Sequence, residues 1–465
     1  MYRRRKSPSV FWKLLVLGAL GYCIFSLWNM TMYFDVREIL ENSILQSKPI
    51  ETEVVEVVSK SGVKAYLFED KTNPIISIRF LFRSGGYAYD YKQGTANLLS
   101  SMLLEGAGNY SSQKLKEELE LRAIDLSFNV DQDDFSGSLT YVKDEAAVAQ
   151  NILSLVLTKP LLSKDDLNRL KEKTLLALKR QQENPSAVLE LEFAKELYGN
   201  HPYARNKLGF DESVKDITAF DLQKFMRERL AKDNLIVGIS GDISPEEAKE
   251  ALEKIFRELP ALAEKRSLPT IKAKFDGRVK SVDREIPQPI TAFSSQGIAR
   301  NHPDFYALYI VNHIFGENGL TSRLSLDIRE NSGLTYNIYT YLLMKDEIDL
   351  IRGGFSSTGE NVGKIIGRLR KQWVDLGKKG VTKKELIDAK SYLIASYNLR
   401  YTSINEIAQM MAYMQRDNLG PDFLKMRNSY IEKVGLEDAN RVAKEYFKKD
   451  NLIFVTIGGN KNGRD

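Results

Sequence analysis

The chain has 465 residues, of which 43% are hydrophobic and 28% charged, a composition typical of a folded protein with more than one domain. Its net charge of +5 comes from 67 basic and 62 acidic residues, and five of the basic residues lie within the first 13 positions. The remainder is nearly balanced, which argues against nucleic acid as a partner. The single cysteine, Cys23, excludes an internal disulfide, so stability must come from packed cores.

A transmembrane anchor is predicted at residues 14–34, which contain no charged side chain. At about 1.5 Å rise per residue, a helix of this length spans roughly 30 Å, the thickness of a bilayer core. The basic segment 1–13 predicts a cytoplasmic N-terminus, with the rest of the chain, after a linker at 35–53, on the far side of the membrane. A cleaved signal peptide is the alternative, although no small-x-small cleavage site follows the apolar run.

No metal site is predicted in this chain. A helical zinc site needs two imidazoles at i and i+4 and a nearby carboxylate that activates the bound water. The chain has three histidines, His201, His302 and His313, and none has another within four residues. We therefore expect all three histidines to be structural.

An internal repeat divides the chain into two halves. The segment Lys-Asp-Asn-Leu-Ile occurs twice, 217 positions apart, and each copy leads into a short apolar strand that ends in glycine. Two further pairs keep a similar offset, one of them a helix start with a Ser/Thr cap and an acidic residue three positions later. The matched pairs are 232–241 with 449–458, 162–167 with 381–386, and the strands that begin at Pro74 and Pro289. Three matches in one order predict a duplicated unit of about 200 residues.

The predicted fold is α+β, with two homologous sandwich domains that each pack helices on an antiparallel-rich mixed sheet. Short apolar strands such as 76–82 and 235–240 alternate with long helical patterns such as 163–182. A charged segment bounded by prolines lies between the halves and predicts a linker at 259–275. The predicted domains are therefore 54–258 and 276–465.

Four segments together resemble the pitrilysin/insulinase family of inverted-motif zinc peptidases. They are the helix frame at 94–106, Gly-Asn-His-Pro-Tyr at 199–203 with a glycine at 209, the glycine-containing loop at 316–324, and Arg-Glu-Asn-Ser-Gly-Leu-Thr-Tyr at 329–336. The resemblance extends from about residue 54 to 459 and is strongest to short bacterial members and to mitochondrial processing peptidase.

The resemblance implies that the zinc motif of this chain is degenerate. Active members carry H-x-x-E-H on the helix and a further glutamate about 75 residues onward. The frame places Asn97, Ser100 and Ser101 at the motif positions and Ala177 near the third ligand. We therefore expect no cofactor in this chain, and zinc in a homologous partner subunit.

The C-terminal half keeps the family pattern more closely. In two-subunit members, an Arg/Tyr pair from the chain without zinc binds the substrate backbone and stabilises the developing oxyanion, and Arg329 and Tyr336 match that pair. The resemblance also suggests substrate contacts at Gly316 and Gly319. The simpler readings are a surface arginine, a tyrosine in an alternating strand, and a turn that ends the helix at 306–315.

The preferred hypothesis is a non-catalytic, substrate-binding subunit of a heterodimeric zinc metallopeptidase that cleaves peptides or unfolded segments. The anchor and the resemblance together imply a bacterial inner membrane, with the bulk of the chain in the periplasm. A scaffold protein without any role in proteolysis is the alternative. An independent peptidase with Ser100 or Ser101 as nucleophile is disfavoured, because the sequence places no histidine or lysine base beside them.

Overall fold

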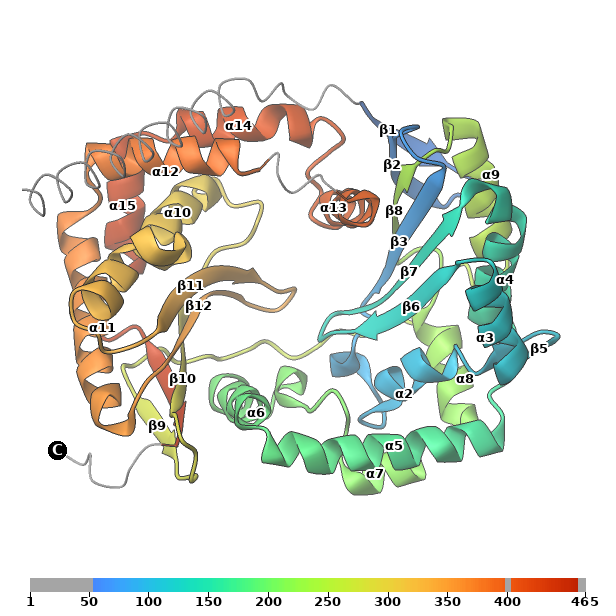
Figure 1. Ribbon diagram of the computed structural model, residues 1–465, viewed down its shortest axis with the longest axis horizontal. Helices are drawn as coiled ribbons and strands as arrows, with labels where there is room; N and C mark the ends of the chain where they lie inside the picture. The colour runs from blue at the N-terminus through green and yellow to red at the C-terminus, as the bar shows by residue number, and fades with distance from the viewer. Residues whose placement is uncertain (1–52, 398–402, 459–465) are drawn as a thin grey trace, which may run out of the picture. The chain divides into compact units, whose positions relative to one another are not determined.

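The computed structural model describes residues 53–397 and 403–458, which form two halves, each with a mixed β-sheet packed with helices (Figure 1). This agrees with the predicted α+β class. The predicted basic segment at 1–13 and the predicted anchor at 14–34 lie outside the described residues. Of the predicted linker at 35–53, only residue 53 is described. Within 53–397 and 403–458, no helix is long and apolar enough to cross a bilayer.

The sheet of the N-terminal half has six strands in the order β1-β2-β8-β3-β7-β6, and β2 and β8 form its parallel pair. The strands are β1 (Val54–Val58), β2 (Lys64–Glu69), β3 (Ile75–Arg83), β6 (Asp125–Val130), β7 (Asp134–Val142) and β8 (Leu235–Gly241), with a separate hairpin of β4 (Gly106–Ala107) and β5 (Tyr110–Ser111). The helices are α2 (Thr95–Met102), α3 (Ser112–Leu121), α4 (Ala146–Thr158), α5 (Lys164–Glu183), α6 (Pro185–Tyr198), α7 (Asp211–Asp216), α8 (Ala219–Arg229) and α9 (Pro245–Phe256), with short turns η1 (Tyr87–Tyr89), η2 (Lys143–Glu145) and η3 (Pro202–Ala204).

The sheet of the C-terminal half has five strands in the order β11-β12-β10-β13-β9, and β13 and β9 form its parallel pair. The strands are β9 (Val279–Val282), β10 (Ile290–Gln296), β11 (Asn337–Met344), β12 (Asp349–Ser356) and β13 (Ile453–Ile457). The helices are α10 (Phe305–Asn312), α11 (Gly359–Lys379), α12 (Lys383–Ala395), α13 (Ile404–Arg416), α14 (Phe423–Lys433) and α15 (Leu436–Tyr446), with the π-helical turns η4 (His313–Glu317) and η6 (Ser325–Glu330) and the 3-10 turn η5 (Gly319–Thr321).

The two sheets share one topology. Their strand orders are β2-β8-β3-β7-β6 and β9-β13-β10-β12-β11, and in both the first pair is parallel and the others antiparallel. The repeated sequence segments at 232–241 and 449–458 become β8 and β13, which occupy equivalent positions. This agrees with a duplicated unit to which β1 has been added in the first half. The domain boundaries at 258 and 276 stay predictions.

Each half contributes a helix to the sheet of the other half. α6 packs on β10 and β13, whereas α13 packs on β8, β3 and β2 (Figure 1). α13 lies close to β8 at Gly238, where an added Cβ would lie 2.1 Å from the backbone oxygen of Ala408. β8 is buried along its whole length, because α13 covers one face of the sheet while α4 and α9 lie beyond the other in Figure 1.

Both helix starts predicted from the capping pattern are confirmed. The Ser163 hydroxyl accepts the backbone N–H of Asp166 at 3.2 Å at the start of α5. At the start of α12, Thr382 accepts the N–H of Glu385 at 3.2 Å, and the Glu385 carboxylate accepts the N–H of Thr382 at 2.7 Å. Each cap satisfies N–H groups that have no partner within the helix.

The predicted linker at 259–275 contributes to a core between the halves. Leu268, Ile271 and Phe275 pack against a cluster that contains Phe193 of α6 and Val455 of β13. The segment is therefore held by apolar contacts along its second part, although its first part is charged.

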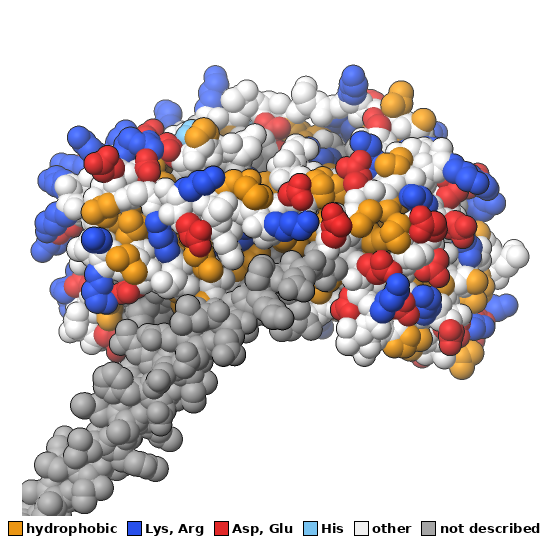
Figure 2. Space-filling model, turned by 90° about the horizontal axis from the view of Figure 1, so that it is seen from above, with side chains coloured by type: hydrophobic (Ala, Val, Ile, Leu, Met, Phe, Trp, Pro, Cys, Tyr) orange, Lys and Arg blue, Asp and Glu red, His pale blue; other side chains and the backbone are white. Residues whose placement is uncertain are grey.

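On the face seen in Figure 2, basic and acidic side chains are interspersed with apolar ones.

Candidate functional site

The start of α2, the helix that carries the predicted positions of the degenerate zinc motif, is fixed by a buried carboxylate. Asp90 accepts the backbone N–H groups of Gly94 at 2.8 Å and Ala96 at 3.0 Å, at the start of α2. Burial raises the pKa of Asp90 to about 7, although these hydrogen bonds oppose the rise. Gly94 has a φ of +97°, and a Cβ there would lie 2.8 Å from the backbone oxygen of Leu208, so glycine is required. The frame is thus rigidly positioned.

The side chains within this frame do not fit a zinc ion. α2 packs on α5, which brings the helix of Asn97, Ser100 and Ser101 against the helix of Ala177. An amide, two hydroxyls and a methyl group offer none of the imidazole, thiolate or carboxylate ligands that zinc prefers. In the part of the chain that the structure describes, no group of three or more His, Cys, Asp or Glu side chains is placed to hold a metal ion.

The Ser100 hydroxyl forms a hydrogen bond with the backbone of its own helix. It donates to the carbonyl oxygen of Asn97 at 2.7 Å, and the residue is buried. Ser101 is exposed one position further along α2. A nucleophilic serine needs a base that accepts its proton, and the Ser100 hydroxyl instead donates to a carbonyl, which disfavours it as a nucleophile.

The predicted Arg/Tyr pair brackets a tight connection between η6 and β11. Gly333, with φ +61°, donates its N–H to the Arg329 carbonyl at 2.9 Å, and Leu334 donates to the Ile328 carbonyl at 3.1 Å. These two bonds end the π-helical turn, as left-handed glycines commonly do at helix ends. The buried Thr335 hydroxyl then lies 2.6 Å from the carbonyl oxygen of Ser356, which fixes the start of β11 on β12.

Both side chains of this pair point to the protein surface rather than into the core. Tyr336 is 81% exposed, and its hydroxyl has no hydrogen-bond partner within the described ranges. The Arg329 side chain is 37% exposed, and its Nε lies 3.3 Å from Glu330, its own neighbour. The phenol and the guanidinium are therefore accessible donors on a fixed backbone. Nowhere in residues 53–397 and 403–458 does a hydrogen bond or ion pair join either side chain to Asn97, Ser100 or Ser101.

The glycine loop differs from the simple turn that would end a helix at Phe315. α10 ends at Asn312, and the chain continues through a π-helical turn that includes Gly316. A Cβ on Gly316 would lie 2.3 Å from the Thr340 hydroxyl of β11, so this glycine permits close packing of η4 on the strand. Gly319 is exposed, has φ +50°, and has open space where a Cβ would be. Substrate contact at either glycine stays a prediction.

The three histidines lie in separate surroundings, as expected of structural residues. His201 and His302 accept backbone N–H groups from Tyr203 at 3.1 Å and Asp304 at 3.0 Å, respectively. His313 is buried and stacks on Tyr392, with ring centres 5.1 Å apart. Its burial lowers the pKa of the imidazole to about 4.

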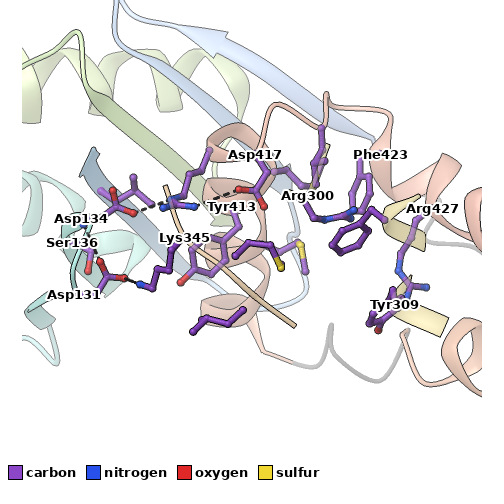
Figure 3. A pocket seen from close by; sticks show the side chains of 18 of the residues that line it. Asp131, Asp134, Ser136, Arg300, Tyr309, Lys345, Tyr413, Asp417, Phe423 and Arg427 are labelled. Carbon is purple, nitrogen blue, oxygen red and sulfur yellow. Dashed lines mark hydrogen bonds and ion pairs between the residues drawn. The ribbon is translucent and has the colours of Figure 1, made fainter. Parts of the chain in front are cut away.

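A cavity that the sequence did not reveal lies where the two halves meet (Figure 3). Its volume is about 470 Å³, and β3, β6, β7 and their turn line it from the first half, while α10, β11, α13 and α14 line it from the second. Asp131 and Asp134 lie at one end in Figure 3, and Arg427 lies at the other. Its lining residues are far apart in the sequence, so no local motif announces the cavity.

Two models of one family match this chain. The model described as "Insulinase (Peptidase family M16)" matches residues 66–209, and "Peptidase M16 inactive domain" matches residues 216–393. Together they span more than two thirds of the chain.

The chain belongs to the M16 (insulinase) family of peptidases.

Individual M16 relatives resemble this chain over most of its length. It is 23% identical over 409 residues to the "Non-peptidase homolog YmxG" of Helicobacter pylori, covering 88% of this chain and 94% of that protein. It is 24% identical over 388 residues to the "Probable mitochondrial-processing peptidase subunit beta" of Schizosaccharomyces pombe, covering 78% and 82%. The crystal structure of a peptidase M16 inactive domain from Pseudomonas fluorescens matches the fold with a TM-score of 0.81 at 24% identity, covering 88% of this chain and 98% of that one.

Membership of the M16 family confirms the family predicted from the sequence motifs. The protein is an M16 peptidase homologue, and one of its relatives carries a name that denies peptidase activity. The assignment of Asn97, Ser100, Ser101 and Ala177 to former ligand positions, and of Arg329 and Tyr336 to substrate binding, stays a prediction.

Proposed function

We propose that this M16 chain is the non-catalytic, substrate-binding subunit of a heterodimeric zinc metallopeptidase that cleaves peptides or unfolded segments. In this proposal zinc is bound by a homologous partner that carries the intact motif. The observation that carries the proposal is the contrast between the two halves. The zinc frame is well positioned but has no ligand side chains, whereas Arg329 and Tyr336 are accessible donors on a backbone fixed by Gly333 and Thr335.

The chemistry of Arg329 and Tyr336 suits binding of a substrate that the zinc-bearing partner subunit cleaves. A guanidinium and a phenol both donate hydrogen bonds at neutral pH without having to lose a proton first. Donors of this kind can hold a peptide carbonyl and stabilise the negative charge that develops on its oxygen. An arginine and a tyrosine needed only for folding would be expected to pack in the core or pair within the chain, and Tyr336 does neither among the residues described.

We also propose that residues 14–34 anchor this subunit in a bacterial inner membrane, with the peptidase-like halves in the periplasm. The support is the uncharged run and the basic segment before it. Labelling of single cysteines placed at Ser7 and at Ser61, in a Cys23→Ser background, tests the orientation with a reagent that does not cross membranes. Protection of position 7 together with labelling of position 61 is expected, and the reverse pattern would contradict the proposed topology.

Reconstitution tests the subunit role. The full-length chain is assayed with fluorogenic peptides alone and mixed with a homologue from the same source that carries the zinc motif. We expect activity only in the mixture, and a loss of about 10²- to 10³-fold in kcat on Arg329→Ala or Tyr336→Phe, the effect of removing one oxyanion donor. Tyr339→Phe, in the strand β11 that follows Tyr336, and Arg227→Ala, on the exposed side of α8, are the matched controls.

A scaffold role is the second candidate, and the name of the Helicobacter pylori relative favours it. Under that role the chain still associates with other proteins, but Tyr336→Phe leaves every associated peptidase activity unchanged. A mixture no more active than the homologue alone, or a pulldown that recovers no homologue with a zinc motif, would therefore support the scaffold role over the subunit role.

A further inference from the structure

The cavity between the halves has two ends of opposite charge (Figure 3). Three carboxylates line one end, those of Asp131, Asp134 and Asp417, together with two cations, Lys345 and Arg416. Ion pairs with Asp133, Asp346 and Arg83 extend this charged network beyond the lining residues. This end therefore carries an excess of negative charge.

One carboxylate oxygen at the acidic end has no hydrogen-bond partner among the described residues. Asp134 is only 6% exposed, and its Oδ2 accepts from Arg416 Nε at 2.8 Å. Its Oδ1 is buried and has no hydrogen-bond partner within the described chain. Leaving a buried carboxylate oxygen unsatisfied is costly, and a ligand that donates a hydrogen bond from a cationic group would remove that cost.

Toward the other end, the cavity presents Arg300, which lies beside Asp417 in Figure 3, and then Arg427. Neither Arg300 nor Arg427 has a carboxylate oxygen within 4 Å in the described part of the chain. Arg427 is 4% exposed, donates to the Leu393 carbonyl at 3.1 Å, and has its guanidinium 3.6 Å from the ring centre of Tyr397. Arg300 donates to the Tyr306 hydroxyl at 3.1 Å. The aromatic rings hold the guanidinium groups in place but do not neutralise them.

The walls between the two ends are largely apolar. Met410 and Met414 of α13, Phe305 of α10, Phe423 of α14 and Leu81 of β3 contribute to the lining. Methionine side chains adapt to ligands of different shape, and aromatic rings offer large contact areas. A volume of about 470 Å³ falls within the usual range for small-ligand sites.

We propose that this cavity binds a short peptide with free ends, with its ammonium group at Asp134, its carboxylate at Arg300 and Arg427, and apolar side chains between the methionine and aromatic walls. Such a ligand matches both charged ends at once. A fatty acid would leave Asp134 unsatisfied, and a polyamine would leave the arginines without an anion. Neither Arg329 nor Tyr336 lines the cavity, and the inference does not depend on a partner subunit.

Titration calorimetry on the full-length chain tests the site with the tripeptide Ala-Phe-Leu. Its N-acetyl derivative, its C-terminal amide and the doubly blocked peptide are measured in parallel. We expect the free tripeptide to bind and each single block to weaken binding by about ten-fold or more, the effect of losing a charge-assisted hydrogen bond. These comparisons use the unaltered protein, so they do not depend on whether a variant folds.

Variants then locate the two ends. Arg300→Gln should weaken binding of the free tripeptide while changing binding of its C-terminal amide little. Asp134→Asn should remove the preference for the free tripeptide over its N-acetyl derivative. Arg227→Gln, on the exposed side of α8, is the control and should change neither preference. Equal binding of free and blocked peptides, sensitivity to a block at one end only, or no binding at 1 mM peptide (about −4 kcal/mol) would overturn the proposal.

Discussion

Arg416, the last residue of α13, donates from Nε to Oδ2 of Asp134, the first residue of β7, across a distance of 2.8 Å. The pair joins a helix of the C-terminal half to a strand of the N-terminal half. Arg416 also lies 3.0 Å from Asp346, in the turn between β11 and β12, while Lys345 of that turn lies 3.2 Å from Asp131 in the turn between β6 and β7. The tips of two topologically equivalent hairpins therefore meet in one charged cluster.

Replacing Arg416 should destabilise the protein. The Arg416→Met variant leaves Asp134 buried without its cation, and breaking such a pair costs about 3 kcal/mol in the free energy of unfolding. Urea denaturation measures the loss. Arg441→Met is the matched control, because the Arg441–Asp304 pair is more exposed and should contribute less than about 1 kcal/mol. Similar losses in both variants would contradict a special role for Arg416.

The closeness of α13 to the first sheet gives a second test. In Gly238→Ala, the added methyl group would lie 2.1 Å from the Ala408 oxygen and 2.4 Å from the Ala412 nitrogen, both backbone atoms. Displacing the helix should cost about 1–3 kcal/mol in unfolding free energy. Gly363→Ala in α11 has open space around the new methyl group and should instead stabilise by roughly 1 kcal/mol. A neutral Gly238→Ala would mean that α13 does not pack this tightly.

Acid should weaken the fold through His313. Burial lowers the pKa of this imidazole from 6.5 to about 4 in the folded protein, so below pH 6.5 the unfolded chain takes up a proton that the folded chain does not. The free energy of unfolding should therefore fall as the pH drops from 6.5 to 4, by up to about 3 kcal/mol at 1.36 kcal/mol per pH unit. His313→Phe should flatten this part of the profile, as measured by urea denaturation at a series of pH values. A slope unchanged in the variant would assign the acid sensitivity to other groups.

Introducing zinc ligands at the predicted motif positions tests whether α2 and α5 still lie in an arrangement that can bind zinc. The variant Asn97→His with Ser101→His and Ala177→Glu places two imidazoles at i and i+4 on α2 and a carboxylate on the helix that packs against it. We expect it to retain about one zinc ion per chain after dialysis, by elemental analysis, while the unaltered chain retains none. Asn97→His with Ser101→His alone should bind more weakly. Zinc content no higher than in the unaltered chain would show that the ligand positions were assigned in the wrong register.

The parts of the fold with local signals could be predicted from the sequence. The repeated strands became β8 and β13, and the capped starts became α5 and α12, because apolar runs and capping residues act within a few positions of themselves. The π-helical turn at Gly316 could not, because it depends on close packing against Thr340 of another element.

The cavity was beyond sequence reasoning for a similar reason. Asp134 and Arg427 lie nearly 300 positions apart, and only the meeting of the two halves brings them to opposite ends of one space. The charge pattern of either segment alone resembles an ordinary solvated loop or helix. Patterns along the chain report periodicity and local hydrogen bonding, whereas a site between halves depends on how the halves dock.

The exchange of α6 and α13 between the two sheets has a consequence for how the protein is made. β8 completes the first sheet at Gly241, but the helix that covers the open face of that sheet ends at Arg416, 175 residues later. At about 5–20 residues per second, synthesis of that interval takes roughly 9–35 s. During this time a sheet face built to receive a helix is uncovered on the nascent chain. The first half is therefore expected to need a chaperone during synthesis, and a chain truncated before α13 should aggregate rather than yield a stable half.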